Sequence, residues 1–416
     1  MSEPGIILFA VDSDGHCKVG LPPANELDIF YDRCIDVGKL GNASHVFFSP
    51  DGQMYAVRGS ELYAGPLIKS QSDNWWEKEA IRVGKTDWDK FSIIFFHPDG
   101  TLYATTKKGK FFKGPVPKNE NVSWLYSQAS EIGSNGWDAF LTLFFDPEGM
   151  LYAVLNNGKL LKRRPPTKLD PWYHTSEVIG DSGWKDLCHF ISFSPDGNLW
   201  CVTQKDGKIC TGKPPANAQV KWPESAKMLG WDYNRYKFIS FTRDKTVQKL
   251  LNLDFLVDDG KILSVGKELL EEQVYENTSS IPLNASFSFT KTIKSESSFA
   301  HEHGFTIDVG AEMSFTTGIP IIEQMGVKIT MNMSTTHTWN FNKINSTQSE
   351  FSRTSTFQVP PGKGIKQTAI IQRARMDVPY QAKVRTLFDY ETTLCGTWKG
   401  ASVYNLIVKQ EDYVLD

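Results

Sequence analysis

Apolar and polar residues alternate along two stretches, residues 305–316 and 325–336. Apolar side chains occupy nearly every second position from Phe305 to Phe315, and polar residues such as Thr306 and Glu312 stand between them. A period of two is that of a β-strand, because successive side chains point to opposite faces. The segment between the stretches, Gly318-Ile319-Pro320-Ile321-Ile322, is apolar. The pattern predicts a β-hairpin with two amphipathic arms and an apolar tip.

The predicted hairpin has the length of a membrane-crossing strand pair. Each arm has 12 residues, which extend roughly 40 Å and, tilted near 45°, cross a hydrocarbon core of about 30 Å. Alternating hairpins also form half-buried strands of soluble sheets, and that interpretation stays open. The apolar tip and the long arms favour insertion, because soluble hairpins usually turn at Asn-Gly or Asp-Gly.

Insertion requires several copies of the hairpin, because only a closed barrel leaves no unpaired backbone groups in the bilayer. Assembly would therefore precede insertion, and the soluble protein would first have to cover the apolar face. One hypothesis is that the Ser/Thr-rich strands form this cover. In the barrel, Asp308, Glu312 and Lys328 would line water. The residues expected to contact lipid are Phe305, Ile307, Val309, Met313, Phe315, Val327, Ile329, Met331 and Met333, with Ile319, Ile321 and Ile322 at the tip.

The first 245 residues repeat a motif. Segments like Phe95-Phe96-His97-Pro98-Asp99-Gly100 recur, and their last glycines, at positions 52, 100, 149 and 197, are 48, 49 and 48 residues apart. Each is followed by a strand such as Leu151-Tyr152-Ala153-Val154 and a Gly-containing turn. Long fixed periods are typical of propellers and solenoids. Each repeat predicts a small antiparallel sheet, or blade.

The two ends of this region complete each other. Residues 8–20 match only the second half of a repeat, and residues 231–245 match only the first half. Joined, they would form a shared blade that closes the ring without a long free edge. We therefore expect a five-bladed β-propeller over residues 1–245.

A loop of the form Gly-x-x-x-Trp-Asp recurs between the predicted blades. An indole can stack on the apolar face of a pyranose while a carboxylate and loop amides bind its hydroxyls. Several such sites would bind a glycan-coated surface with high avidity. Alternatively, the tryptophans are packing wedges between blades. The candidate sugar-binding residues are Trp88, Asp89, Trp137, Asp138, Trp184, Trp231 and Asp232.

These repeats resemble the tachylectin-2-like family of five-bladed propeller lectins over residues 6–245. The resemblance implies binding of N-acetylglucosamine at the loops. Two loops depart from the family pattern: Asn42-Ala43-Ser44 has no Trp, and Lys185 stands where Asp is usual. We expect these two sites to be weak or inactive.

Composition changes after residue 245. From Thr278 to Phe357, 26 of 80 residues are Ser or Thr, interspersed with alternating Phe, Ile, Val and Met. This predicts long strands rather than disorder, so the whole chain is expected to be all-β. Turns are predicted at Asp258-Asp259-Gly260 and Pro360-Pro361-Gly362. Besides the two hairpin arms, strands are predicted at 251–257, 285–293, 338–357, 365–375 and 382–388.

This second region resembles the aerolysin-type, ETX/MTX2-like pore-forming module. The resemblance rests on Tyr275-Glu276-Asn277-Thr278, the Phe287–Ile293 segment, the hairpin and Asp377-Val378-Pro379-Tyr380. It implies soluble monomers that bind a surface receptor, assemble into a homo-oligomeric ring and each add one hairpin to a barrel in the lipid membrane. The predicted domains are a propeller lectin at 1–245 and an elongated pore-forming β-sheet module at 246–416, with the insertion hairpin at about 304–336.

Composition and motifs argue against several other classes of function. The net charge of −3 lacks the basic excess that nucleic-acid binding needs, so no nucleic acid is expected as partner. Catalytic motifs are not recognised, and we expect neither enzyme activity nor a cofactor. The six Cys lack Cys-x-x-Cys spacing, which argues against zinc and for free thiols. His301 and His303 are a conceivable metal pair, but a solvated pair is favoured, so no metal site is expected.

The N-terminus carries no recognisable secretory signal, and no apolar run of 18 residues occurs. We expect a soluble protein that acts outside the cell after release, as a toxin or in innate defence. Two alternatives stay open. One is a non-lytic multimeric lectin or agglutinin with a structural β-tail; the other is an intracellular propeller that binds proteins.

Overall fold

The computed structural model describes residues 5–68, 74–117, 120–169, 171–301, 305–323, 328–341 and 343–415, without the side chains of 308–310. The chain divides into two compact units between Thr246 and Val247. Both units consist mainly of β-strands. The all-β fold class predicted from the sequence is therefore confirmed.

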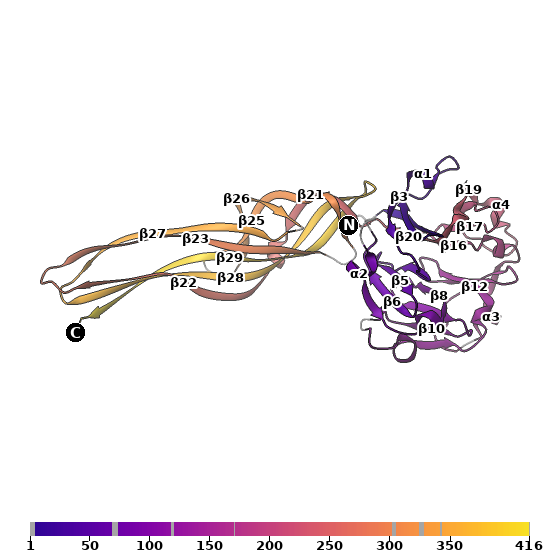
Figure 1. The fold of residues 1–416 in the computed structure, drawn as a ribbon, viewed down its shortest axis with the longest axis horizontal. Helices are drawn as coiled ribbons and strands as arrows, with labels where there is room; N and C mark the ends of the chain where they lie inside the picture. Colours follow the sequence, from indigo (N-terminus) through magenta and orange to yellow (C-terminus); the bar gives the residue numbers. More distant parts are fainter. Residues whose placement is uncertain are drawn as a thin grey trace. The chain divides into compact units, whose positions relative to one another are not determined.

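The first unit is a β-propeller of five four-stranded antiparallel sheets (Figure 1). We name the sheets blades A to E. Blade A contains β20 (Tyr236–Arg243), β1 (Ile6–Asp12), β2 (His16–Gly20) and β3 (Ile35–Lys39). Blade B contains β4 (His45–Phe48), β5 (Met54–Arg58), β6 (Glu61–Gly65) and β7 (Ile81–Gly84).

The other three blades follow in chain order. Blade C contains β8 (Phe91–Phe96), β9 (Leu102–Thr106), β10 (Phe111–Gly114) and β11 (Ser130–Gly133). Blade D contains β12 (Phe140–Phe145), β13 (Leu151–Leu155), β14 (Leu160–Arg163) and β15 (Glu177–Gly180). Blade E contains β16 (Phe190–Phe193), β17 (Leu199–Val202), β18 (Ile209–Gly212) and β19 (Lys227–Gly230).

Blade A closes the ring. Its strand β1 pairs with β20 along its whole length, from Ile6 opposite Arg243 to Asp12 opposite Tyr236. The prediction that the two ends of the repeat region form one shared blade is confirmed, and so is the number of blades.

Short helical segments connect the outer strands. Within each blade one precedes the last strand: α1 (Phe30–Arg33), α2 (Trp75–Lys78), η2 (Trp124–Gln128), α3 (Trp172–Thr175) and α4 (Trp222–Ser225). Four more follow the last strand, in the linkers to the next blade: η1 (Trp88–Lys90), η3 (Trp137–Ala139), η4 (Trp184–Leu187) and η5 (Tyr233–Arg235). In the described part of the chain, no helix is long and apolar enough to cross a membrane.

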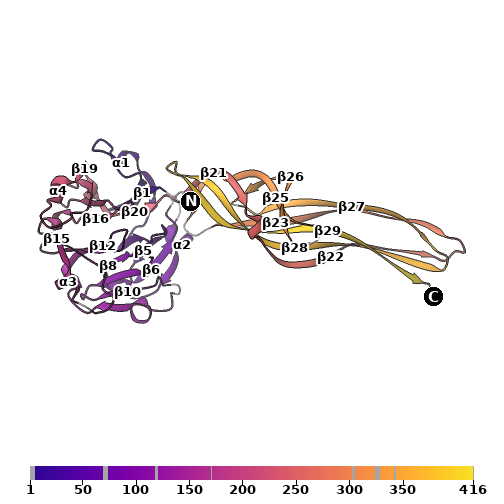
Figure 2. The same ribbon diagram turned by 180° about the vertical axis from the view of Figure 1, so that it is seen from behind.

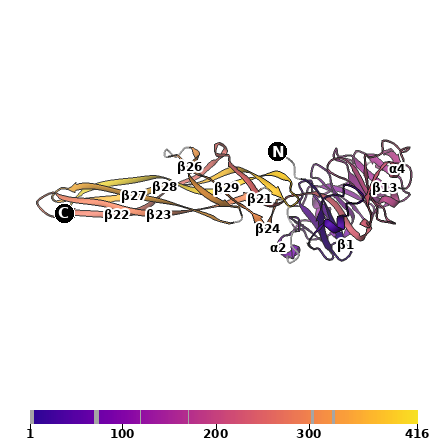
Figure 3. The same ribbon diagram turned by 90° about the horizontal axis from the view of Figure 1, so that it is seen from above.

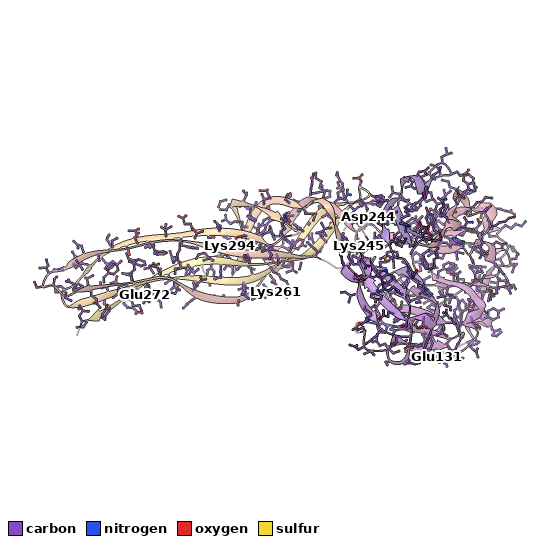
Figure 4. All side chains as sticks on the ribbon, viewed as in Figure 1. Glu131, Asp244, Lys245, Lys261, Glu272 and Lys294 are labelled. Carbon is purple, nitrogen blue, oxygen red and sulfur yellow. The ribbon has the colours of Figure 1, made fainter. Side chains whose placement is uncertain are left out.

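The second unit is built from long strands that run side by side, as Figures 1 to 3 show for β22, β23, β27 and β28. Its central strand, β28 (Lys363–Thr386), pairs with β29 (Glu391–Val414) on one side and with β21 (Thr246–Phe255) and β22 (Lys261–Asn277) on the other. A turn, η6 (Val257–Asp259), joins β21 to β22. Figure 4 labels Glu272 on β22 and Lys294 on β23 along these long strands.

Two Ser/Thr-rich strands form the other half of this unit. They are β23 (Leu283–His301) and β27 (Asn345–Val359), which pair without interruption from Leu283 opposite Val359 to Ser297 opposite Asn345. Their Phe287 and Phe289 pack against Ala369 and Ile371 of β28 in a core at this part of the sheet.

Three shorter strands lie between β23 and β27 in the chain. They are β24 (Thr306–Glu312), β25 (Ser314–Ile322) and β26 (Ile329–Asn340). Strand β24 lies beside β21 in the large sheet, whereas β25 and β26 form a two-stranded sheet of their own.

Candidate functional sites

Each linker between blades is held by a backbone hydrogen bond at its aromatic residue. The N–H groups of Trp88, Trp137 and Trp184 donate to the carbonyl oxygens of Ser60, Gly109 and Gly158, at 3.3, 3.2 and 3.1 Å. These carbonyls belong to the hairpin turns of the preceding blades. The residue before each Trp has a left-handed φ, 75° at Asp87, 80° at Gly136 and 84° at Gly183. The linkers are thus fixed in one repeated conformation.

The three linker tryptophans are buried, with exposed fractions of 1%, 5% and 3% for Trp88, Trp137 and Trp184. Each ring lies against a second Trp from the segment before the last strand of the next blade. Centroids are 5.6 Å apart for Trp88 and Trp124, 5.6 Å for Trp137 and Trp172, and 5.5 Å for Trp184 and Trp222. These rings pack between blades, as one interpretation of the sequence anticipated.

A glycine leaves room for each linker Trp. A Cβ on Gly84, Gly133 or Gly180 would lie 2.1, 1.9 or 1.8 Å from the indole Nε1 of Trp88, Trp137 or Trp184. Such contacts are far inside van der Waals distance. The glycine that opens each Gly-x-x-x-Trp motif is therefore required by the packing of the indole against the backbone.

Replacing Gly133 with Ala should displace the Trp137 indole and destabilise the propeller by about 1–3 kcal/mol, the usual cost of overpacking. Urea unfolding of the full chain, followed by Trp fluorescence, measures this. The exposed neighbour Ser134→Ala is the control and should change stability by less than about 0.5 kcal/mol. Equal unfolding midpoints for the two variants would contradict the packing role.

The fourth linker differs in which aromatic residue is buried. Tyr233, not Trp231, donates its N–H to a preceding hairpin turn, at 3.0 Å from the Gly207 carbonyl oxygen, and begins η5. Asp232 holds the left-handed φ of 66° before it. This linker is one residue shorter between its Gly and its buried ring, which shifts the motif. Trp231 itself is 48% exposed.

A cavity of about 760 Å³ opens beside the Trp137 linker. Its lining comes from three segments: the linker at 133–140, the β13–β14 turn at Leu155–Asn157, and the loop containing Leu169 and α3. Polar side chains reach it from Ser134, Asn135, Asn156, Asn157 and His174, and Tyr173 lines it with 47% of its surface exposed. A cavity of this size with a few polar groups suits a small polar ligand.

A related cavity of about 350 Å³ lies at the Tyr233 linker. Trp231, Asp232 and Arg235 line it together with Tyr31 from α1. The Arg235 guanidinium lies 4.5 Å from the centre of the Tyr31 ring. Of the residues predicted from the sequence, the structure therefore brings Trp231 and Asp232 together in one cavity.

The other predicted aspartates lie elsewhere. Asp89 and Asp138 are exposed, and Asp138 is not part of the cavity beside Trp137. Its carboxylate lies against the turn of the preceding blade, where a Cβ on Gly109 would be 2.4 Å from Oδ1. Asp138 thus contacts a hairpin turn, and Asn156, Asn157 and Tyr173 supply polar groups at the cavity.

At the corresponding position of blade C, polar contacts connect the linker before the blade with the segment before its last strand. Asp87 accepts hydrogen bonds from Lys90 at 2.6 Å and from Ser123 at 3.0 Å, and Lys90 also donates to the Tyr126 hydroxyl at 3.2 Å. Burial alone would raise the pKa of Asp87, but hydrogen bonds from Lys90, Ser123 and Thr86 outweigh it and lower this pKa. The linker and the loop before β11 are thus tied together here.

The blade B linker, Asn42-Ala43-Ser44, has no Trp, and the second Trp of α2 fills space beside it. Trp76 is buried and donates from Nε1 to the Leu40 carbonyl oxygen at 3.1 Å. Trp184 keeps the packing of its equivalents beside the exposed Lys185. Whether these two positions bind less strongly stays a prediction.

The sequence analysis did not single out the tryptophans that precede the last strand of four blades. Trp75, Trp124, Trp172 and Trp222 are 49, 48 and 50 residues apart. Each donates from Nε1 to a backbone carbonyl, at 2.6 to 2.8 Å. The repeat of these tryptophans at intervals of 48 to 50 residues is the signal in the sequence that could have identified them as part of the inter-blade packing.

The hairpin predicted around an apolar tip has a different arrangement in the folded chain. Gly318 to Ile322 are not a turn but part of β25, with Ile319 opposite Asn332 and Ile322 opposite Ile329. The first predicted arm is interrupted at Met313, between β24 and β25. Pro320 fits because β25 pairs with one strand only in the described residues, and proline is tolerated on such an edge.

Tertiary packing explains this arrangement. Met313, Ile322 and Ile329 are buried in a core with residues of β21, β28 and β29, and Phe305, Ile307, Phe315 and Ile319 pack against it. The apolar face is thus covered mainly by these strands, and Phe299 of the Ser/Thr-rich strand β23 also belongs to this core, 5.9 Å from the Trp339 ring. Met331 and Ile321 are half-buried and Met333 is 64% exposed. The side chain of Val309 and all of Val327 lie outside the described residues.

Trp339 of β26 is the centre of this core and is fully buried. Its ring lies 5.6 Å from Phe255 and 5.7 Å from Trp398, and its Nε1 donates to the Gly318 carbonyl oxygen at 3.1 Å. Ion pairs also tie the segment to the sheet, between Glu312 and Lys249 at 2.7 Å and between Lys328 and Asp258 at 3.7 Å.

His301, at the end of β23, lies beside this core. Its Nδ1 is 2.8 Å from the Tyr380 hydroxyl, and its ring stacks on Phe341 with centroids 5.6 Å apart. Burial lowers the pKa of His301 from its usual value, and a backbone hydrogen bond to Phe341 partly offsets this. The folded protein therefore holds this imidazole in its neutral form.

Acidification should destabilise the second unit through His301. Because its folded-state pKa is lowered, the unfolded chain binds the proton first as the pH falls below about 6.5, so stability decreases between pH 7 and pH 5. His301→Gln should reduce this loss, measured as thermal unfolding at both pH values. The control is His16→Gln in the propeller. An unchanged pH dependence in His301→Gln would contradict the expectation.

Taken together, a propeller with inter-blade cavities and a long-stranded sheet with a covered apolar hairpin define a lectin-type unit joined to a unit of the pore-forming-toxin type. The chain belongs to the Tachylectin family, whose model matches residues 10–238. The model of the family of Clostridium epsilon toxin ETX and Bacillus mosquitocidal toxin MTX2 matches residues 236–404. These are a lectin family and a toxin family.

Several solved structures are similar to parts of this chain. One, described as "The de novo evolutionary emergence of a symmetrical protein is shaped by folding constraints", is 30% identical, with 57% of this chain and 98% of that chain covered and a TM-score of 0.51. Lamprey immune protein is 15% identical, with 76% and 87% covered and a TM-score of 0.33. An aerolysin-like protein of Bombina maxima is 12% identical, with 39% and 99% covered and a TM-score of 0.26. A search of curated proteins finds no match.

Proposed function

We propose that this protein is a carbohydrate-binding pore-forming protein that acts on target membranes outside the cell. The propeller binds N-acetylated sugars, with N-acetylglucosamine as the first candidate, in the cavities between its blades. The second domain, residues 246–416, then assembles with other copies and inserts its hairpin as a shared β-barrel. The proposal treats residues 1–245 as the binding domain.

The cavity beside Trp137 supports the sugar-binding step. Tyr173 offers an exposed aromatic ring, and Asn156 and Asn157 offer amides that both donate and accept hydrogen bonds. An N-acetylated sugar presents an apolar ring face, hydroxyl groups and an amide, which match these groups. The cavity that contains Trp231 and Asp232 is the second candidate site.

The single observation that carries the pore-forming step is the register of β23 and β27. Leu283 faces Val359 and Ser297 faces Asn345 in an uninterrupted ladder. If the two strands continued to pair in this register beyond Ser297, Ala311 would lie opposite Met331 and Met313 opposite Ile329. The ladder would reach its turn at Pro320-Ile321-Ile322, which is the apolar tip expected from the sequence. Apolar residues of both arms then share one face, as a barrel wall in lipid requires.

The folded protein holds the same segment in another register. Ser314 faces Asn340, whereas the continued ladder would place Ser314 opposite Lys328, twelve positions away. Inner residues are shifted as well, since Ile322 faces Ile329. The proposed change therefore separates β25 from β26 and re-pairs the segment as an extension of β23 and β27.

The decisive experiment is dye release from lipid vesicles that carry N-acetylglucosamine-terminated glycolipids, with the full chain and with excess free sugar. Sugar-inhibited release together with a detergent-resistant oligomer is the expected result. Binding without release would favour the alternative, a non-lytic multimeric lectin with a structural β-tail. The absence of both binding and release would contradict the proposal as well as the alternative.

A cavity variant tests the sugar site separately. Tyr173→Ala should weaken binding of monovalent N-acetylglucosamine about tenfold, because a lost ring contact and its hydrogen bonding amount to roughly 1.4 kcal/mol. Titration calorimetry on the full chain measures this, with the exposed Tyr413 of β29, outside the propeller, changed to Ala as the matched control. Equal affinity in both variants would place the sugar elsewhere.

A further inference from the structure

Blade E contains two cysteines that face each other across neighbouring strands. Cys201 of β17 is directly opposite Cys210 of β18, and the pairs on both sides, Trp200 with Thr211 and Val202 with Ile209, keep the register regular. Directly opposite residues of antiparallel strands have Cα atoms about 4.5–5.5 Å apart, within the range that a disulfide spans.

The two side chains lie on the same face of the blade. Cys201 is fully buried in the core between blades D and E, and Cys210 packs against that core. The two thiols interact electrostatically, which raises the pKa of Cys201 and lowers the pKa of Cys210. Both are free thiols in this structure. Bond formation therefore requires little movement of either strand.

We propose that Cys201 and Cys210 are an oxidation site that forms a cross-strand disulfide when the protein meets a low-molecular-weight disulfide, such as glutathione disulfide. The Cys210 thiolate attacks one sulfur of that molecule and releases one glutathione thiolate. Cys201 then loses its proton, its thiolate attacks the Cys210 sulfur, and the second glutathione thiolate leaves. Two protein thiols are oxidised, and one external disulfide is reduced to two thiols.

The order of the two steps follows from the environments of the two sulfurs. Contact with Cys201 lowers the pKa of Cys210, which is half-buried, whereas the same contact and burial raise the pKa of Cys201. The more accessible sulfur is thus also the better thiolate, as the attacking position requires. Cys201 is placed to resolve the mixed disulfide because it lies on the opposite strand.

The disulfide would link β17 to β18 close to the turn that connects them. That turn contains Gly207, whose carbonyl oxygen accepts the N–H of Tyr233 in the linker to blade A. Tyr233 lines the cavity with Trp231 and Asp232. Oxidation would therefore stabilise the support of one candidate binding cavity once the protein leaves a reducing environment.

The test uses the full chain, purified reduced and then incubated with glutathione disulfide. After alkylation, mass spectrometry should show loss of two hydrogens and a peptide that links Cys201 to Cys210, and the propeller melting temperature should rise by about 5 °C, since a short closed loop is worth a few kcal/mol. Cys210→Ala should abolish both changes, and Cys395→Ser should abolish neither.

Three results would overturn the proposal. They are full alkylation of both cysteines after oxidation, a linked peptide that joins either cysteine to another partner such as Cys188, and a stable Cys210 mixed disulfide that Cys201 does not resolve. If Cys210→Ala fails to fold, Cys210→Ser is the substitute, because the half-buried position accepts a hydroxyl of similar size.

Discussion

Oxidation of the double variant Thr316→Cys/Thr338→Cys should abolish dye release, and reduction should restore it. The two threonines face each other in β25 and β26, with hydroxyl oxygens 2.8 Å apart. A disulfide between them fixes the folded register, because it holds the two Cα atoms within about 7 Å. The proposed re-pairing moves these strands past each other by twelve residues, or roughly 40 Å. A locked protein would bind its target and stay inactive.

The chain offers a matched control in the other ladder. Ser288 of β23 faces Thr354 of β27, with hydroxyl oxygens 3.0 Å apart, and both side chains are exposed. A disulfide from Ser288→Cys/Thr354→Cys fixes the register that the proposed hairpin keeps. This variant should release dye whether oxidised or reduced. Equal loss of release in both locked variants would show that the register change is not the step being blocked.

Met333→Arg should reduce dye release by at least about tenfold while leaving the soluble protein folded. Met333 is 64% exposed, so a charge there does not disturb the core. In the proposed barrel it faces lipid, where an arginine near the bilayer centre costs about 2–4 kcal/mol in each protomer. Thermal unfolding of the soluble form and dye release from sugar-bearing vesicles measure the two effects separately.

Ser334→Arg is the control for this substitution. Ser334 is the next residue, is also exposed, and belongs to the opposite face of a strand. Its arginine would face the water-filled lumen, so release should continue. Comparable activity of the two variants would contradict the proposed lipid-facing side. Ile329 is a poorer test position, because it is 4% exposed and a charge there would unfold the soluble form.

The sequence predicts the propeller well because each blade carries its own local signals. Turn residues such as Gly100 and Gly149 have the left-handed φ that their motif demands, at 87° and 79°. Trp231 is not equivalent in position to the buried tryptophans, since a linker one residue shorter buries Tyr233 instead. In this linker Trp231 directly follows Gly230, whereas three residues separate Gly from Trp in the other linkers, so a Trp-Asp pair at a similar place in the repeat does not occupy the same position in the fold.

The second unit is harder to predict, because its strands are specified by their partners. The segment Lys261–Asn277 contains Glu268-Leu269-Leu270-Glu271-Glu272, which lacks strand alternation, yet it pairs with β28 over its length. The predicted strands 365–375 and 382–388 are one strand, β28, which continues through Pro379. Pairing on both sides, not local preference, holds these residues extended.

The candidate sites are likewise predicted in part by the sequence and in part only by the tertiary structure. The tip at Gly318–Ile322 follows from composition, but its place in β25 depends on a cover formed by β21, β28 and β29. The alternation of apolar residues fits the proposed barrel register as well as the folded one, and packing against the covering strands stabilises the folded one. Similarly, Tyr173 and Asn157 meet at the Trp137 cavity because the fold brings a turn and a loop of blade D together.

Ring closure in blade A also sets the order of events during synthesis. Strand β1 leaves the ribosome well before its partner β20, which ends at Arg243. At about 5–20 residues per second, β1 waits roughly 10 to 50 s for that partner. Its Phe9 and Val11, buried in the finished propeller, are exposed to solvent and chaperones throughout that time. The propeller is therefore completed just as the second unit begins to emerge, so the propeller precedes the long-stranded unit in time as well as in sequence.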